Sequence, residues 1–517
     1  MPLRSFLAAI LVLLAFTFAT RAEDALAKRI DELTSQPRFQ HAHWGILFVD
    51  LKTGEKIYQH NADKLFAPAS TTKLYSVATA LDALGADYRF ETPLKHTGTR
   101  DNGSITGDLI LVASGDLTMG GRTTESGEIA FVDSDHTYSN WIDDATLTPQ
   151  DPLAGIKELA RQVAAAGVKK ITGDVLIDDR LFDHAEGSGS GPGNLTPIVV
   201  NDNVIDFLIE PTEEGRPAKV TTRPPTSIYQ IDANVETVGK DEKLATWITD
   251  DGKGNLRLTG KIPAGRQPLV RHWEVTDAAG FARSLLIEAL REAGVEVGGK
   301  PALRHPPQST MISREEVAKL PEVAKLVSPP FAENARLILK VSHNLHASTL
   351  PLLVATRQGK RTLADGLKLE AEFLKRNGID VEAVSFGGGA GGARSDYVTP
   401  NVTVQLLAYM ATRTDFDVYL RAQPILGVDG TLAKSVGPDS PARGQAQAKT
   451  GTLTWDNGLS GRGLCTSKAL AGYLTTKSGR KLAFAAFVNG VHLKEGLETK
   501  HIGQDLGKLC EIVFEER

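Results

Sequence analysis

The chain has 517 residues, 41% of them hydrophobic, so it can bury more than one core and about two to four domains are expected. The formal net charge of -5, with both signs interspersed, gives no reason to expect nucleic acid as a partner. Cys465 and Cys510 are too far apart for a CxxC redox pair and too few for a cysteine-rich zinc site; one disulfide and two isolated buried thiols remain equally open.

The first 22 residues have the pattern of a signal peptide. Arg4 precedes an apolar run over 6–18, and the small residues of Thr20-Arg21-Ala22 suit a signal peptidase. The run is shorter than the ~20 residues that span a bilayer comfortably, so we expect cleavage before Glu23 and no stable membrane anchor. An uncleaved anchor stays open as the alternative. The mature protein is expected to be periplasmic or otherwise exported.

The N-terminal region predicts a helix, a hairpin and a second helix. Apolar residues within 27–33 recur at helical spacing. Two β-like segments, 43–51 and 55–61, bracket the turn residues 52–54. A second helical run over 74–84 is ended by a glycine.

Ser70 falls at or near the start of that second helix, with Lys73 on the same face one turn later. A lysine held close to a hydroxyl can accept its proton if its own pKa is lowered, and a helix N-terminus favours developing negative charge. Serine is also a common N-cap, and about two S-x-x-K matches are expected by chance. The second match, Ser478 to Lys481, falls in a predicted turn, so local position favours the first pair.

Residues 89–265 are rich in short β-like runs, with one helical segment at 152–168 and a flexible glycine-rich stretch at 187–194. No polar cluster in this region forms a recognisable catalytic set. We expect one or two β-rich subdomains, inserted into the core fold, that pack beside the site and shape access for a large substrate.

Two downstream segments could complete a site around a nucleophilic serine. Ser342-His343-Asn344 offers a hydroxyl and an amide that point the same way if the segment is extended and can diverge if it is a loop. Lys449-Thr450-Gly451-Thr452 alternates like a strand, so that Lys449 and Gly451 share a face. The glycine would let a ligand approach the backbone closely.

The rest of the chain predicts an α/β (α+β) core. Helical segments around 277–293 and 361–377 are expected to surround Ser342, and a hairpin over 469–491 precedes a final helix near 495–514. With the N-terminal hairpin and the Lys449 strand, these elements predict a central antiparallel sheet of about five strands flanked by helices on both faces.

The first and last parts of the chain would therefore meet in one domain. We expect residues 23–88 and 266–517 to form this discontinuous domain, and the β-rich insertion 89–265 to interrupt it. A large interruption between motifs of one site is compatible with the separation of Lys73 and Ser342, which is about 270 residues.

The ordered motifs S-x-x-K, S-x-N and K-T-G resemble those of the penicillin-recognising serine enzymes, the penicillin-binding proteins and serine β-lactamases. The long gap between the first two motifs is similar to the penicillin-binding protein 4 type of D-alanyl-D-alanine carboxypeptidase/endopeptidase. Other segments that look like this family lie at 113–121, 171–179, 275–299 and 427–433. The resemblance implies a β-lactamase/transpeptidase-like fold over nearly the whole mature chain.

The resemblance also implies catalytic roles. Ser70 would be the nucleophile and Lys73 the base that takes its proton. Ser342 would pass a proton toward the leaving group, and Lys449 would help to set the potential around it. No cofactor is implied.

Substrate-binding roles are implied for the neighbouring motif residues. Asn344 would hydrogen-bond a backbone amide of the substrate, although a cap is the plain alternative for an asparagine there. The N–H groups of Ser70 and Thr452 would form an oxyanion hole. Thr450 and Thr452, with Gly451 between them, would hold the terminal carboxylate, unless they are ordinary strand residues.

Three places depart from the family's pattern. His343 stands where the family commonly has aspartate, and the segment after Ala347 carries Pro351 and lacks an expected acidic residue. Residues 386–397 keep the glycines of an Asp-Gly-Ser-Gly-Leu-Ser type segment and lose the rest. His343 and His346 form an H-x-x-H, but no third ligand cluster is evident, so no metal site is expected.

The leading function is an exported serine hydrolase that removes terminal D-alanine from peptidoglycan stem peptides or cuts their cross-links, and that β-lactam antibiotics inhibit covalently. A β-lactamase or esterase is the alternative on the same chemistry, although the E-x-x-L-N segment of one β-lactamase class is missing. A catalytically weak cell-wall-binding relative is the third possibility.

Overall fold

The computed structural model describes residues 25–189, 191–302 and 304–515. The predicted signal peptide, residues 1–22, lies outside this part of the chain. Two compact units are formed: the first comprises residues up to Thr79, Ser188–Ser190 and Leu367 onward, and the second comprises Ala80–Gly187 and Gly191–Gly366. The unit boundaries fall inside the helices α2 (Lys73–Leu84) and α8 (Leu363–Arg376).

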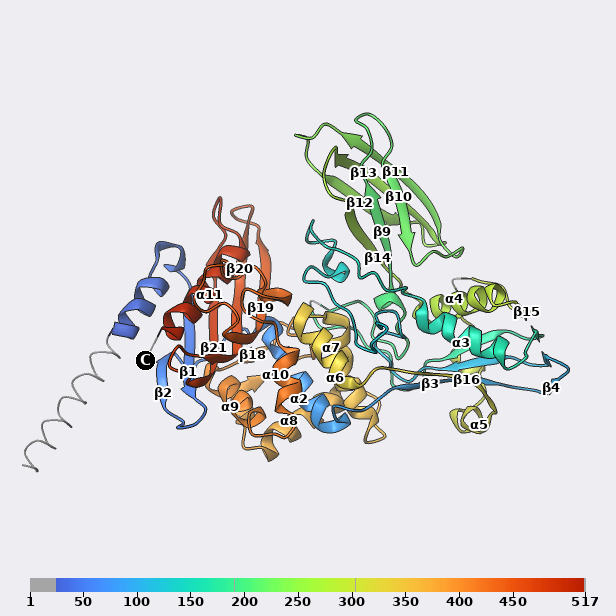
Figure 1. Cartoon of the computed structure of the whole chain (residues 1–517), viewed down its shortest axis with the longest axis horizontal. Coiled ribbons are helices and arrows are strands. Elements are labelled where there is room, and N and C mark those ends of the chain that lie inside the picture. The colour runs from blue at the N-terminus through green and yellow to red at the C-terminus, as the bar shows by residue number, and fades with distance from the viewer. Residues whose placement is uncertain (1–24, 190, 303, 516–517) are drawn as a thin grey trace, which may run out of the picture. The chain divides into compact units, whose positions relative to one another are not determined.

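The first unit is built on one antiparallel sheet with the strand order β19-β20-β21-β1-β2, and the short β22 also pairs with β20. Because β1 pairs along its whole length with β21, the two ends of the chain meet in one sheet, as the blue and red strands of Figure 1 show. The predicted sheet of about five strands is confirmed. Its strands are β1 (His43–Asp50), β2 (Lys56–His60), β19 (Ala446–Asn457), β20 (Arg462–Thr475), β21 (Lys481–Asn489) and β22 (Val491–His492).

Helices cover both faces of this sheet, because alternate strand residues are apolar on each side. On one face, residues 25–34 and α11 (Thr499–Phe514) pack on Phe48 and Phe484. On the other face, the turn η2 (Ala69–Thr72) packs on β19 and β20, and α9 (Pro400–Met410) packs on β21 and β1. Smaller elements of the unit are η1 (Pro37–Phe39), η6 (Val381–Ala383), β17 (Val384–Ser385), β18 (Tyr397–Val398), α10 (Phe416–Ala422) and η7 (Gly430–Leu432).

The second unit is rich in short strands, as predicted for the insertion. Its sheets have the orders β16-β3-β6-β8, β15-β7-β5-β4, β10-β9-β14 and β11-β13-β12 in the described residues, and they share one apolar core with α3 (Ala154–Ala165) and α4 (Ala278–Glu292). The helices α6 (Phe331–Val341) and α7 (Asn344–Thr356) complete the unit together with short turns and α5 (Arg314–Lys319). The strands are β3 (Glu91–His96), β4 (Arg100–Asp101), β5 (Ser104–Ile105), β6 (Leu109–Val112), β7 (Lys170–Ile171), β8 (Val175–Asp178), β9 (Val204–Glu210), β10 (Lys219–Arg223), β11 (Gln230–Val238), β12 (Ala245–Asp250), β13 (Asn255–Pro263), β14 (Leu269–Glu274), β15 (Glu296–Val297) and β16 (Glu322–Val327).

The second unit extends past residue 265, where the insertion was predicted to end. Strand β14 pairs with β9 and strand β16 pairs with β3, so elements beyond that position complete sheets begun before it. The helix predicted around 277–293 is present as α4, but it packs against α3 and β8 and not around Ser342 as expected. Strand pairing over more than 200 residues explains the difference, because no local pattern reports it.

The cysteines are two free, buried thiols in the apolar core of the first unit. Cys465 lies on β20 and Cys510 on α11. Burial raises the pKa of Cys465 to about 11 and that of Cys510 to about 12, because a thiolate is poorly solvated there. None of the helices in the described ranges is long and apolar enough to cross a membrane.

We therefore predict that neither thiol reacts with Ellman's reagent in the folded protein, since the reactive thiolate is both rare and inaccessible. In guanidinium chloride, without prior reduction, the reagent should titrate two thiols per chain. Titration of no thiol in denaturant, reversed by a reductant, would contradict the free state of the pair.

Candidate active site

Ser70 lies in a tight turn that the sheet of the first unit holds in place. The turn is the 3-10 element η2, and α2 begins directly after it, as the sequence predicts. Ala69 has a φ of +48°, a left-handed conformation that is costly for a residue with a Cβ. Asn489 Oδ1 accepts the N–H of Ala67 at 2.8 Å, and Ser467 Oγ donates to the Ala67 carbonyl at 2.6 Å. The strands thereby fix the segment that leads into the serine.

Lys73 is the first residue of α2 and is completely buried. Its Nζ donates to Ser70 Oγ at 2.8 Å and to the carbonyl oxygen of Ala390 at 2.8 Å. Burial lowers the pKa of Lys73 to about 7, although the nearby Asp396 carboxylate opposes this shift. The amine is therefore close to a hydroxyl and able to accept a proton near neutral pH.

The glycine-rich segment 386–397 forms one wall beside Lys73. Its residue Ala390 supplies the carbonyl that Lys73 contacts, and the Gly389 carbonyl accepts the hydroxyl of Ser76, one turn further along α2, at 3.0 Å. Gly391 has a φ of +88°, and a Cβ added there would overlap the Ala69 carbonyl oxygen. Glycine is thus required at this position by its backbone conformation and by the close approach to the serine turn.

Asp396 holds this glycine-rich segment in shape. One carboxylate oxygen accepts the N–H of Gly387 at 2.8 Å and the other accepts the N–H of Ala393 at 2.8 Å. The side chain is buried, and burial raises its pKa to about 6 against the opposing effects of these hydrogen bonds and of Lys73. Asp396 therefore presents a partly charged carboxylate near the amine.

Lys449 and Gly451 lie on β19 and share a face, as the alternation predicts. The Lys449 amine is buried and donates to the Thr450 carbonyl at 2.7 Å. Burial, with smaller effects of Lys73 and Lys468, holds the pKa of Lys449 well below its usual range. A Cβ on Gly451 would lie 2.6 Å from the Pro68 carbonyl oxygen, so the glycine admits the backbone of the serine turn, where a ligand was expected.

Thr450 and Thr452 point to the other face of β19. The Thr450 hydroxyl donates to Thr431 at 2.8 Å, and the Thr452 hydroxyl accepts from the amine of Lys468 at 2.8 Å. Lys468 lies opposite Thr452 on β20, and burial lowers its pKa. The sequence analysis did not single out Lys468, although it lies on a predicted strand next to the K-T-G motif.

Ser342 and Asn344 belong to the second unit. Ser342 ends α6 in the left-handed conformation, with a φ of +65°, and Asn344 begins α7. His343, between them, caps α7 by accepting the N–H of His346 on its side chain at 3.4 Å. The motif is thus neither an extended strand nor an open loop; it is a tight link between two helices, and the cap is His343 instead of Asn344.

The structure brings Ser70, Lys73, Lys449 and Gly451 together in the first unit. The residues that the sequence analysis missed there are Asp396, Ala390 and Lys468. A single aspartate and a backbone carbonyl cannot be recognised as a sequence motif. The signal in the sequence for Asp396 and Ala390 was the unusual density of glycines between 386 and 397. Glycines in such number indicate close backbone approach.

A serine hydroxyl contacted by a buried lysine of lowered pKa, at the start of a helix on an antiparallel sheet, defines a serine acyl-transfer enzyme. The chain belongs to the D-Ala-D-Ala carboxypeptidase 3 (S13) family, whose model matches residues 26–508. It is therefore a serine-type D-Ala-D-Ala carboxypeptidase by family.

The relatives agree with this family, and a solved structure agrees with the fold. The chain is 27% identical to a D-alanyl-D-alanine carboxypeptidase of Actinomadura sp. (strain R39), over 90% of this chain and 81% of the relative. It is 25% identical to the D-alanyl-D-alanine carboxypeptidase DacB of Haemophilus influenzae, over 86% and 85%. The crystal structure of penicillin binding protein 4 (dacB) from Haemophilus influenzae matches with a TM-score of 0.71 at 22% identity, covering 94% of this chain and 99% of that one.

Replacing Gly391 by alanine tests whether the glycine-rich wall holds the serine turn. Gly479 is a matched control, because its φ of +87° nearly equals the +88° of Gly391, yet an added Cβ meets nothing within 4 Å. Each alanine should destabilise the fold by about 1–2 kcal/mol through its backbone conformation. Only Gly391→Ala should also reduce release of D-alanine, by about 100-fold, because it displaces the Ala69 carbonyl.

Thermal unfolding and D-alanine release should be measured on both variants. Equal activity in Gly391→Ala and Gly479→Ala would refute the steric role of the wall.

Proposed function

We propose that the protein is an exported D-Ala-D-Ala carboxypeptidase/endopeptidase that acts on peptidoglycan stem peptides through an acyl-enzyme on Ser70 and is acylated by penicillins. The single observation that carries the proposal is the contact between Ser70 Oγ and a buried Lys73 whose pKa is about 7. Export rests on the sequence pattern of residues 1–22.

In the proposed acylation step, Ser70 attacks the carbonyl of the penultimate D-alanine. Lys73 takes the hydroxyl proton, for which a neutral amine is needed. Its second contact, to the Ala390 carbonyl, supports the protonated form once the proton has arrived, because a carbonyl accepts a charged donor strongly. One amine can thus alternate between base and acid around pH 7.

Strand β19 supports an oxyanion hole at Thr452. Ala446 and Ala448 exchange backbone hydrogen bonds with residues 424–426 along the outer edge of the sheet. Backbone groups alternate in direction along a strand, so Thr450 and Thr452 turn their N–H and C=O groups to the same outer edge. The N–H groups of Thr452 and Ser70 would stabilise the developing oxyanion, and such donors are worth about 3–4 kcal/mol each.

The remaining roles follow the family resemblance. Ser342 would deliver the proton to the departing D-alanine, and Asn344 would bind a backbone amide of the substrate. Thr450 and Thr452, with the amines of Lys449 and Lys468 beside them, would hold its terminal carboxylate. Water would then hydrolyse the acyl-enzyme.

Covalent labelling with a fluorescent penicillin tests the nucleophile. A crystal structure of the Haemophilus influenzae relative is complexed with a β-lactam, which supports the choice of probe. Wild type should be labelled and Ser70→Ala should not. Ser478→Ala removes the serine of the second S-x-x-K sequence, in the turn between β20 and β21, and should be labelled normally.

Absence of label on the wild type, or loss of label in Ser478→Ala, would refute the assignment of Ser70. A diacyl-D-Ala-D-Ala peptide and a cross-linked muropeptide then distinguish carboxypeptidase from endopeptidase activity. The released product, D-alanine or separated stem peptides, is measured in each case.

The pH dependence of acylation tests the base. Lys73 acts in its neutral form, so the acylation rate should rise with pH, with a midpoint near 7, and level off above it. Asp396→Asn removes a negative charge that raises the pKa of Lys73, so the midpoint should move to lower pH. A stopped-flow pH profile of both proteins gives the answer, and a midpoint that moves upward in the variant would contradict the electrostatic role of Asp396.

A further inference from the structure

The second unit contains a buried ionic cluster that the proposed reaction does not use. Its centre is Asp202, in the short turn η4 (Asn201–Asn203) just before β9. All three residues of this turn have positive φ, between +49° and +55°, although none is glycine. Such a backbone is costly, and it persists only where the surroundings hold it in place.

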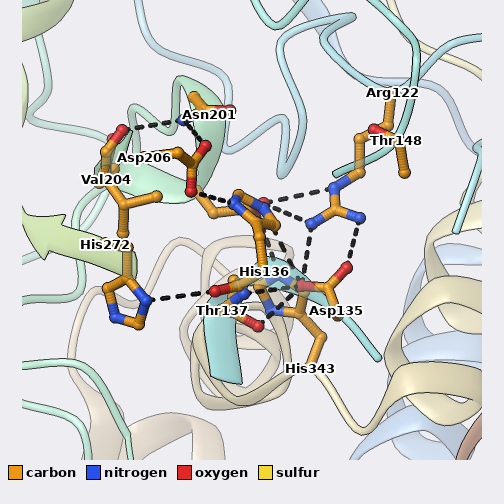
Figure 2. A network of polar contacts seen from close by, with 12 residues as sticks. Arg122, Asp135, His136, Thr137, Thr148, Asn201, Val204, Asp206, His272 and His343 are labelled. Atoms are coloured by element: carbon orange, nitrogen blue, oxygen red, sulfur yellow. Dashed lines mark hydrogen bonds and ion pairs between the residues drawn. The ribbon is translucent and has the colours of Figure 1, made fainter. Parts of the chain in front are cut away.

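Four side chains hold the Asp202 carboxylate. Oδ2 accepts from Arg122 at 2.7 Å and from His136 at 2.9 Å. Oδ1 lies 3.1 Å from Nε2 of His343 and 2.8 Å from Nε2 of His346. Figure 2 shows how Arg122, His136 and His343 converge from separate elements. Against the opposing effect of burial, these neighbours hold the pKa of Asp202 well below its usual range.

The charges of the cluster balance without the histidines of α7. Its carboxylates are Asp135, Asp202 and Asp206, and the first shares the Arg122 guanidinium. The cations are Arg122, His136, whose pKa is raised to about 10 by Asp206 and Asp135 against the effect of burial, and Arg223, which lines the same small cavity. His343 adds to this set a short contact with Asp202, and its electrostatic effect contributes to the low pKa of that carboxyl group.

The two ring nitrogens of His343 face different partners. Nδ1 accepts the N–H of His346 as the cap of α7, and Nε2 lies 3.1 Å from Oδ1 of Asp202. His343 is fully buried, and because its Nε2 makes no hydrogen bond of good geometry, its approach to the Asp202 carboxylate is an electrostatic contact. The ring thus lies between the helix cap and the Asp202 carboxylate, and His343 itself stands between Ser342 and Asn344 in sequence.

Ser342 needs such support, because its left-handed backbone is unfavourable for a residue other than glycine. The hydroxyl of Tyr138 donates to the Ser342 carbonyl on one side, and the fixed His343 ring follows on the other. We propose that Asp202, acting through the imidazole of His343, is a positioning residue that holds Ser342 and Asn344 in the orientation that acylation requires. The inference rests on the proposed function, in which these two residues contact the substrate.

A metal ion is the competing explanation for the same residues. Asp202 supplies the third group that the H-x-x-H sequence lacked, and the three ligand atoms lie within 4.8 Å of one another. However, the His343 and His346 rings are stacked, with centroids 3.6 Å apart and planes inclined by 17°. An imidazole nitrogen binds a metal in the plane of its ring at about 2.0–2.1 Å, and one ion cannot lie in two nearly parallel planes.

Two substitutions of His343 separate its two contacts. Asparagine places an acceptor near the position of Nδ1, so His343→Asn keeps the α7 cap and loses the contact with Asp202. Glutamine places an N–H donor near the position of Nε2, so His343→Gln keeps the contact with Asp202 and weakens the cap. The second-order rate constant of acylation by fluorescent penicillin should fall about 10- to 100-fold in His343→Asn and stay within about threefold of wild type in His343→Gln.

His346→Asn is the matched control. This variant removes the other contact to the same oxygen of Asp202. His346 lies in α7, but it is not adjacent in sequence to Ser342 or Asn344. It should lower the melting temperature about as much as His343→Asn does and leave the acylation rate unchanged. A double variant, Asp202→Asn with His343→Asn, should acylate no more slowly than Asp202→Asn alone, because both changes break one connection.

If His343→Gln were acylated more slowly than His343→Asn, the proposal would be overturned, and the helix cap alone would explain the role of His343. Unchanged acylation in His343→Asn, equal loss in His346→Asn, or loss with a chelator that Zn²⁺ restores would also overturn it. A wild type that takes no label would refute the proposed function itself, whereas a labelled wild type matched by His343→Asn refutes this inference alone.

Discussion

The burial of one amine, that of Lys73, is the constraint on which the site in the first unit depends. Removing an ammonium from water costs several kcal/mol, so burial favours the neutral base over the cation. Contacts that limit this cost include those with Ser70 Oγ and the Ala390 carbonyl. Lys449 is a second buried amine within electrostatic reach, and each positive charge would make the other more costly. At a given pH, Lys73 and Lys449 together therefore carry less positive charge than two exposed lysines would.

Keeping water from Lys73 requires close packing of backbone on backbone. Gly391 and Gly451 approach the serine turn from two elements, and Ala69 in that turn is itself left-handed. A residue with a Cβ at either glycine would push its segment away from the serine turn by about the width of a methyl group. The glycines of 386–397 therefore keep a structural purpose although the surrounding family pattern is lost, since what they supply is proximity and a carbonyl rather than a side chain.

Sequence reasoning was strongest where the signal is local. The hairpins, the helix behind Ser70 and the strand that carries Lys449 follow from periodicity and turn residues, and the sheet follows from them. It was weakest where the partner is distant. Asp202 precedes His343 by more than 140 residues and lies in a three-residue turn without a pattern, so the H-x-x-H sequence gave no hint of it. The extent of the second unit was missed for the same reason. Strands of two to six residues carry little pattern of their own and are defined by the distant strands with which they pair.

The pairing of β1 with β21 has a consequence for the order in which this enzyme becomes active. Asn489 and Ser467 support Ala67 across 422 and 400 residues of chain, so the serine turn gains its anchors only when the last strands are in place. Contacts of such long sequence separation form late, because the loop between them must close first. A chain that ended just after the K-T-G motif would carry every residue proposed for catalysis and none of these supports. The last strands to be synthesised therefore complete the support of a serine that stands near the start of the chain.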